Sequence, residues 1–229
     1  MRSHSWLIRL AVIITSALLV NLNAQSFSSL VTFDGTNGEY PNSSPLVQGT
    51  DGNLYGTTEF GEANGNYGTI FRITPDGTLT TIYSFCAQTK CMDGASPQGG
   101  LLLGNDGNFY GTTWVGGHGN CGYATPGCGT IFRVTPTGML KTLYRFCLQK
   151  KCPDGGNPNG SLVFGTDGSL YGTTYSGGNP SCGGCGTVFR LDSNAQLTSL
   201  HLFDLANGGY PVAGLLQGFD GKFYGTTWI

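Results

Sequence analysis

The hexapeptide Asn53-Leu54-Tyr55-Gly56-Thr57-Thr58 decides the fold, because near copies of it recur at residues 108–113, 169–174 and 222–227. The tyrosines of these four copies are 55, 61 and 53 residues apart along the chain. Self-similarity with a period of this length is the signature of tandem structural repeats. The sequence therefore predicts an array of similar units that pack on one another.

One unit, residues 44–85, divides into four segments with strand character, at 45–49, 53–59, 68–74 and 78–85. Each segment is apolar or alternates between apolar and polar residues, and glycine-containing turns separate the segments. Four antiparallel strands in a period of 53 to 61 residues are typical of a β-propeller blade. We therefore expect an all-β fold, a β-propeller of four-stranded antiparallel blades.

The chain holds three complete units, at about 44–85, 97–146 and 158–203, and two partial pieces at 27–33 and 211–229. The first piece would be a fourth strand and the second piece a first and a second strand, so together they would form a partial blade that lacks its third strand. Strands from both ends of a chain can close a propeller and cover its sheet edges. Two interpretations stay open: a four-bladed ring with one incomplete blade, and a truncated piece of a longer array.

Residues 1–24 have the pattern of a secretory signal peptide. Arg2 and Arg9 give a positive start, residues 10–20 form an apolar run, and Leu22-Asn23-Ala24 is a plausible cleavage site. The run is too short to span a bilayer, although an uncleaved N-terminal anchor is the alternative. We expect a mature repeat domain at 25–229 that is secreted or at the cell surface and has no transmembrane segment.

Three motifs together carry a family resemblance: D-G-N-L-Y-G-T-T at 51–58, G-T-I-F-R-I-T-P at 68–75 and L-T-T-I-Y-S-F at 79–85. The combination resembles the GloVer-type tandem repeats of exported "choice-of-anchor" bacterial proteins. It covers essentially everything after the signal peptide, and it implies a propeller-like exported protein without a defined activity. We expect the chain to depart from the family in having few repeats and no sorting or anchoring segment after Trp228-Ile229.

Composition argues against nucleic acid as a partner. The formal net charge is -2, and without residues 1–24 there are 9 basic against 13 acidic residues. Proteins that bind nucleic acid need clustered Lys and Arg to neutralise phosphates. Charged residues are 10% of the chain and glycines number 39, so most polar positions belong to turns.

The chain has eight cysteines, an even number in a chain with an export signal, which favours disulfides. They fall in four local pairs: Cys86 and Cys91, Cys121 and Cys128, Cys147 and Cys152, and Cys182 and Cys185. Each pair can close its own loop, and such short closures pin loops more than they hold a fold. A zinc site made by Cys121, Cys128, Cys182 and Cys185 is the alternative, although its spacing is loose. We expect disulfides and no metal site.

A catalytic constellation is not visible. Eight of the ten aspartates directly precede glycine, which indicates turn formation. The freer carboxylates are Glu39, Glu59, Glu62, Asp192 and Asp204, and the sequence pattern does not pair them. The chain contains no nucleophile elbow, zinc-protease or phosphate-loop motif, and we expect no cofactor and no catalytic residue.

One recurrent position points to a binding surface. The residue after each Gly-Thr-Thr is Glu59, Trp114, Tyr175 or Trp228, so three of the four copies place an aromatic side chain there. Aromatic rings on one face of a propeller suit stacking on a glycan or contact with a surface protein. Alternatively, these rings pack between blades, as large aromatic side chains usually do.

The leading hypothesis is a non-enzymatic exported β-propeller repeat protein that acts as a binding or surface-display module. A carbohydrate-active propeller enzyme, a glycoside hydrolase or lyase, is the second hypothesis, and it would need carboxylates that converge on one face. A structural fragment of a longer repeat array is the third.

Overall fold

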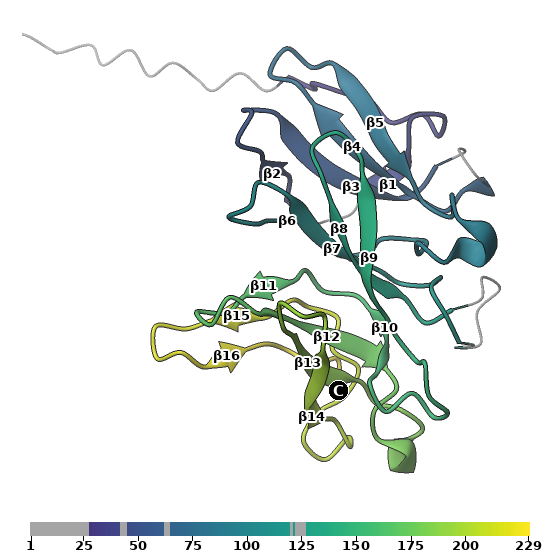
Figure 1. Ribbon diagram of the computed structural model, residues 1–229, viewed down its shortest axis with the longest axis vertical. Coiled ribbons are helices and arrows are strands. Elements are labelled where there is room, and N and C mark those ends of the chain that lie inside the picture. The colour runs from purple at the N-terminus through teal and green to yellow at the C-terminus, as the bar shows by residue number, and fades with distance from the viewer. Residues whose placement is uncertain (1–27, 42–44, 62–64, 120, 122–126) are drawn as a thin grey trace, which may run out of the picture.

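A computed structural model describes residues 28–41, 45–61, 65–119, 121 and 127–229. The expected signal peptide at 1–24 and Glu62 lie outside the described residues. In the described part of the chain, regular structure consists of strands and two short 3₁₀ turns, η2 (Thr89–Cys91) and η3 (Pro180–Cys182). The strands form antiparallel sheets that follow one another along the chain (Figure 1). The all-β prediction is confirmed.

The first sheet has five strands in the order β1-β3-β4-β5, with β2 also paired to β3. Their bounds are β1 (Glu39–Pro41), β2 (Val47–Gln48), β3 (Leu54–Phe60), β4 (Thr69–Ile73) and β5 (Leu79–Ser84). The second sheet has four strands in sequence order, namely β6 (Leu102–Leu103), β7 (Phe109–Thr113), β8 (Thr130–Val134) and β9 (Leu140–Arg145). The four segments expected in each of these two units are therefore present as strands.

The third sheet repeats the first. Its order is β10-β12-β13-β14, with β11 also paired to β12. The bounds are β10 (Gly156–Pro158), β11 (Val163–Phe164), β12 (Leu170–Ser176), β13 (Thr187–Leu191) and β14 (Leu197–Leu202). A fourth sheet contains two strands, β15 (Leu216–Gln217) and β16 (Phe223–Tyr224).

The sequence pattern does not predict β1 and β10. Each pairs with the C-terminal half of a long strand, Glu39 with Phe60 and Gly156 with Ser176. The N-terminal halves of the same long strands pair instead with β2 and β11. One edge of these sheets is thus shared by two short strands, which are too short to show an alternating pattern.

The Asp-Gly turns position the start of each second strand. Asp51 accepts a hydrogen bond from the backbone N–H of Asn53 at 3.1 Å and from the hydroxyl of Tyr55 at 2.7 Å. Burial and this carboxylate raise the pKa of Tyr55 to about 12, and the tyrosine hydroxyl in turn lowers the pKa of Asp51. The same pairing joins aspartate and tyrosine at 106 and 110, 167 and 171, and 220 and 224. These aspartates are turn residues, as expected.

Aromatic side chains pack between neighbouring sheets. The rings of Tyr55 and Phe109 lie 4.2 Å apart between centroids, and Tyr171 stacks on Phe223 at 4.0 Å. A second set of contacts joins the phenylalanine after a fourth strand to the third strand of the following sheet, Phe85 to Phe132 at 5.2 Å and Phe146 to Phe189 at 5.3 Å. Almost all of these rings are buried, and the buried residues form two core clusters, one around Phe85 and Phe132 and the other around Phe146 and Phe189.

Paired threonine hydroxyls explain the end of the repeated hexapeptide. The second threonine of Gly-Thr-Thr meets a threonine of the neighbouring strand, Thr58 with Thr69 at 2.7 Å and Thr113 with Thr130 at 2.9 Å. The third sheet has the same pair at 174 and 187, also at 2.9 Å. Buried hydroxyls need partners, and these pairs satisfy each other inside the sheets. The hexapeptide is therefore a scaffold element.

The expected partial blade is not formed as predicted. Residues 28–33 are not a strand, and among the described residues none of them pairs with β16. Phe33 instead packs on Phe71 of the first sheet, with ring centroids 5.0 Å apart. In the three larger sheets the last strand pairs with the strand that precedes it, and the fourth sheet contains only β15 and β16, so the strand on which residues 28–33 were expected to pair is missing from the described part of the chain.

Candidate functional site

The three aromatic residues that follow Gly-Thr-Thr come together in space. Trp114 directly follows β7, Tyr175 lies in β12, and Trp228 follows β16 by four residues. The ring of Tyr175 lies 5.4 Å from that of Trp114 and 6.5 Å from that of Trp228. Successive sheets thus present these rings at equivalent places, with Tyr175 in the centre.

A fourth ring, missed by the sequence analysis, belongs to the same group. Tyr210 lies 5.1 Å from Tyr175 between ring centroids. Its backbone N–H donates to the carbonyl of Cys185 at 2.8 Å, and its own carbonyl accepts from the N–H of Trp228 at 3.3 Å. The signal was present in the sequence, since Gly-Tyr-Pro at 209–211 repeats the Tyr-Pro of Tyr40. We call Trp114, Tyr175, Tyr210 and Trp228 the aromatic row.

The exposure of the aromatic row sets it apart from the inter-sheet rings. Tyr55 and Phe109 are completely buried, whereas Trp114, Tyr175 and Tyr210 are half-buried and Trp228 is 69% exposed. Contacts between the rings hold them in place, and the remaining ring area faces solvent. The row therefore combines the two interpretations given above, because its members pack on each other and still offer an apolar surface.

In the first sheet the equivalent position is polar. Glu59 of β3 accepts a hydrogen bond from the side-chain amide of Gln98 at 2.8 Å. Gln98 lies in the segment that leads to β6, so this bond joins the first two sheets. A carboxylate that is tied to its neighbour in this way differs from the three aromatic copies, and the aromatic row begins only at the second sheet.

The aspartates are occupied by structural hydrogen bonds. Asp93 is completely buried and accepts bonds from the Tyr83 hydroxyl at 2.7 Å and from the backbone N–H groups of Ala87 and Gln88. Burial, followed by the bond to this carboxylate, raises the pKa of Tyr83. Every aspartate of the chain accepts at least one hydrogen bond from a group within ten residues of it: Asp34, Asp51, Asp76, Asp93, Asp106, Asp154, Asp167, Asp192, Asp204 and Asp220.

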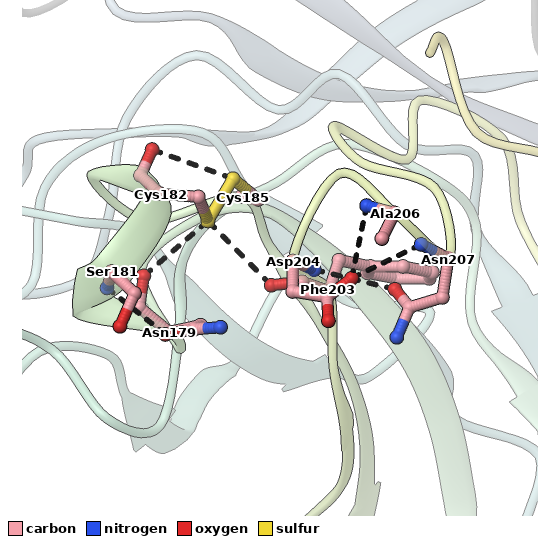
Figure 2. Close-up of a disulfide and its surroundings, with 8 residues drawn as sticks. All are labelled: Asn179, Ser181, Cys182, Cys185, Phe203, Asp204, Ala206 and Asn207. Carbon is pink, nitrogen blue, oxygen red and sulfur yellow. Dashed lines mark hydrogen bonds between the residues drawn. A yellow bond between two sulfur atoms is a disulfide. The ribbon is translucent and has the colours of Figure 1, made fainter.

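The eight cysteines form four disulfides within their own loops, as expected: Cys86–Cys91, Cys121–Cys128, Cys147–Cys152 and Cys182–Cys185. Figure 2 shows the last of these beside the loop that follows β14. There Cys182 Sγ lies 3.6 Å from the carbonyl oxygen of Phe203. Asp204 closes that loop by accepting from the N–H groups of Ala206 and Asn207, at 3.0 Å each. A hydrogen-bonded aspartate thus stands where the two preceding units have a disulfide.

The zinc site considered as an alternative in the sequence analysis combined the Cys121–Cys128 loop with the Cys182–Cys185 loop, whereas the structure brings the Cys121–Cys128 loop next to the Cys147–Cys152 loop. The sulfur atoms of Cys121 and Cys128 lie near those of Cys147 and Cys152, all within 4.8 Å of one another. The loop after β7 and the loop after β9 leave the second sheet at the same end, because antiparallel neighbours alternate in direction. Cys182 and Cys185 belong to the third sheet and to a different loop pair.

A family model described as the Gloeobacter/Verrucomicrobia repeat matches residues 17–125 and again residues 122–229. The chain belongs to this repeat family. The two matches between them cover the three larger sheets and the aromatic row, so the repeated hexapeptide and its Asp-Gly turn are features of a member of this family. No curated protein matches the sequence.

Solved structures give distant similarities. The chain is 16% identical to a protein described as a candidate gluconolactonase, with a TM-score of 0.47, covering 80% of this chain and 56% of that one. It is 14% identical to a luciferin-regenerating enzyme, with a TM-score of 0.47 and coverages of 80% and 53%. It is 13% identical to the extracellular domain of a candidate hybrid two-component system from B. thetaiotaomicron, with a TM-score of 0.49 and coverages of 84% and 22%. The repeat protein spans about half the length of the first two and less of the third.

The three larger cavities found in the described part of the chain, of about 360, 520 and 540 Å³, are not lined by members of the aromatic row. A cavity of about 360 Å³ is lined by Tyr110 and Phe164 among others, and Tyr110 lies toward the start of β7 rather than its end. Another, of about 520 Å³, is open to solvent beside Cys121 and Cys152. Within the described residues, none of the helical segments is long and apolar enough to cross a membrane.

Proposed function

We propose that this protein is an exported, non-enzymatic β-propeller repeat protein that binds a glycan chain through the aromatic row. The observation that carries the proposal is the convergence of Trp114, Tyr175, Tyr210 and Trp228 into one partly exposed group of rings. Aromatic rings bring large apolar area and lose little conformational entropy on binding, so they suit the flat apolar faces of sugar rings.

The propeller arrangement is supported by the way in which neighbouring sheets meet. The same ring contact recurs between the first and second sheets, at Tyr55 and Phe109, and between the third and fourth, at Tyr171 and Phe223. A radial array of blades brings equivalent positions of successive sheets to one face. The end of each second strand is such a position, which accounts for the aromatic row.

Export is supported by the pattern of residues 1–24 and by the disulfides. With residues 1–24 removed, the secreted or surface-located repeat domain would retain Trp114 and Trp228 as its two tryptophans, since Trp6 belongs to the removed segment. A surface protein is the second kind of partner that such an aromatic surface fits.

The carbohydrate-active enzyme is the weaker candidate. Glycoside hydrolysis uses two carboxyl groups that flank the scissile bond about 5 to 9.5 Å apart. The aspartates of this chain already serve turns and tyrosine hydroxyls, and Glu59, which takes the place of an aromatic residue in the first sheet, is bonded to Gln98. This arrangement supports binding without turnover.

A glycan array combined with a polysaccharide-turnover screen tests the proposal. The purified chain is expected to bind a defined set of glycans and to release no product. Tyr175→Ala should weaken binding about 10- to 100-fold, the cost typical of a central aromatic contact. Tyr40→Ala is the control, because Tyr40 is the first unit's counterpart of Tyr210 and packs on Phe60, outside the aromatic row. Product release would refute the non-enzymatic assignment, and an unchanged affinity of Tyr175→Ala would refute the site.

A further inference from the structure

The four sulfur atoms of the second sheet form one compact cluster. Cys121 and Cys128 lie in the loop between β7 and β8, and Cys147 and Cys152 lie after β9. All four Sγ atoms are within 4.8 Å of one another. In a tetrahedral zinc site with Zn–S bonds of about 2.3 Å, the sulfurs are about 3.8 Å apart. After reduction each pair would open from the S–S bond length of about 2 Å to this distance, and the more distant sulfurs would close in by about 1 Å.

The repeat explains why the cluster exists in the second sheet. The first unit has cysteines only in the loop after its fourth strand, Cys86 and Cys91. The third unit has them only in the loop between its second and third strands, Cys182 and Cys185. The second unit has both loops, and both leave the sheet at the same end. A single pair offers two ligands, whereas the second unit offers four, the number that structural zinc sites use.

Two cysteines of the cluster are buried and two are accessible. Cys128 is completely buried, and its carbonyl accepts from the N–H of Asn157 at 2.7 Å. Cys147 is 8% exposed, and its N–H donates to Asp154 at 2.9 Å. Two cysteines are thus held by the backbone of their loops.

The other two cysteines face an entry path. Cys121 and Cys152 line the open cavity of about 520 Å³, together with Lys151. An ion or a small reductant can reach the sulfurs from this side. The ammonium group of Lys151 would oppose the net charge of -2 that four thiolates and one Zn²⁺ carry.

We propose that the second sheet holds a redox-gated zinc site, in which Cys121, Cys128, Cys147 and Cys152 bind one Zn²⁺ when their disulfides are reduced. Two equivalents of a dithiol reductant supply four electrons and four protons, so that both S–S bonds break and four thiols form. Zn²⁺ then displaces the four thiol protons. Reoxidation by two equivalents of a low-molecular-weight disulfide, which accept the four electrons and become thiols, restores both S–S bonds, removes the ligands and releases the ion. Soft thiolate ligands favour zinc over the hard cations.

Zinc titration of the reduced chain tests the site. The full chain is reduced with dithiothreitol, freed of reductant under anaerobic conditions, and titrated with ZnCl₂ against a chromophoric chelator. We expect one tightly bound Zn²⁺ per chain and none in the oxidised protein. Cys121→Ser/Cys128→Ser should weaken binding at least about 100-fold, because two ligands remain. Cys86→Ser/Cys91→Ser is the matched control and should bind as the parent does.

Two results would overturn the proposal. One is equal zinc affinity in the reduced parent and in Cys121→Ser/Cys128→Ser, and the other is loss of binding in the Cys86→Ser/Cys91→Ser control. If reduction unfolds the chain, circular dichroism can still test the site by following the strand signal as zinc is added. One equivalent of Zn²⁺ should then restore the strand signal of the parent but not that of Cys121→Ser/Cys128→Ser, since metal binding and folding are coupled. Failure to restore the signal also counts against the site.

Discussion

Replacing Phe146 by alanine tests the inter-sheet contacts in the most quantitative way. Phe146 follows β9, is completely buried, and meets Phe189 of the third sheet edge-on at 5.3 Å. Removing a buried phenylalanine costs the transfer free energy of the ring plus the cavity that it leaves, about 3–5 kcal/mol. For a chain of this size that corresponds to a fall in Tm of about 6–20 °C.

The repeat supplies an internal control for this substitution. Phe203 occupies the equivalent place after β14, but it is only half-buried, and its ring meets that of His201 in β14, with centroids 4.8 Å apart. Phe203→Ala should therefore cost about 1–2 kcal/mol, since less apolar area is lost from the interior.

Urea unfolding followed by far-ultraviolet circular dichroism measures both variants, and calorimetry gives the corresponding Tm values. The account predicts that Phe146→Ala loses at least twice as much free energy of unfolding as Phe203→Ala. Equal losses of unfolding free energy in the two variants, or a loss below about 1 kcal/mol for Phe146→Ala, would mean that the phenylalanine contacts between sheets do not stabilise the fold.

Two further predictions concern turns. The backbone N–H of Ser169, with Arg190 and Tyr171, lowers the pKa of Asp167 to about 2, below the value of about 3.9 for an unfolded carboxyl. Because the folded pKa is the lower one, this contribution to stability is present above about pH 5 and is lost as the pH falls toward 2. As the pH is lowered from 7 to 2, the urea concentration at the midpoint of unfolding should fall more steeply for the parent than for Asp167→Asn. Parallel curves would argue against a stabilising role of the ionised Asp167 in this turn. Gly138→Ala should lower the free energy of unfolding by more than about 3 kcal/mol, because φ at Gly138 is +88° and a Cβ there would collide with the backbone carbonyl of Ile82. Gly107 also has a positive φ, +73°, but open space surrounds it, so Gly107→Ala should cost about 1 kcal/mol in the same urea assay. Similar losses for the two glycine variants would contradict the close approach of the first two sheets at Gly138.

The strands could be predicted from the sequence because their signals are local. The Asp-Gly turn before Tyr55 and the alternation between residues 78 and 85 both act within a few residues, and both elements are found where expected. The short strands β1 and β10 could not be predicted, since they are defined by pairing with β3 and β12 and carry too few residues for a pattern.

The candidate site was predictable in part. The position after Gly-Thr-Thr identified three of the four rings, because a repeat places equivalent residues at equivalent points. Tyr210 belongs to a different position of the repeat, so its neighbours depend on how sheets pack. The zinc alternative combined cysteines from loops that do not meet, for the same reason: the order of loops along the chain does not tell which loops share an end of a sheet. The alternating direction of strands in an antiparallel sheet does show which loops lie at the same end.

The most direct measurement of the central claim is a fluorescence titration of the chain without residues 1–24, whose two tryptophans, Trp114 and Trp228, both belong to the aromatic row. A glycan identified on the array should change the intensity or wavelength of this emission in a saturable way. The same titration of Tyr175→Ala should require about 10- to 100-fold more ligand, and that of Tyr40→Ala the same amount as the parent. Saturable binding that leaves the tryptophan emission unchanged, with equal affinity for the parent and Tyr175→Ala, would contradict the account.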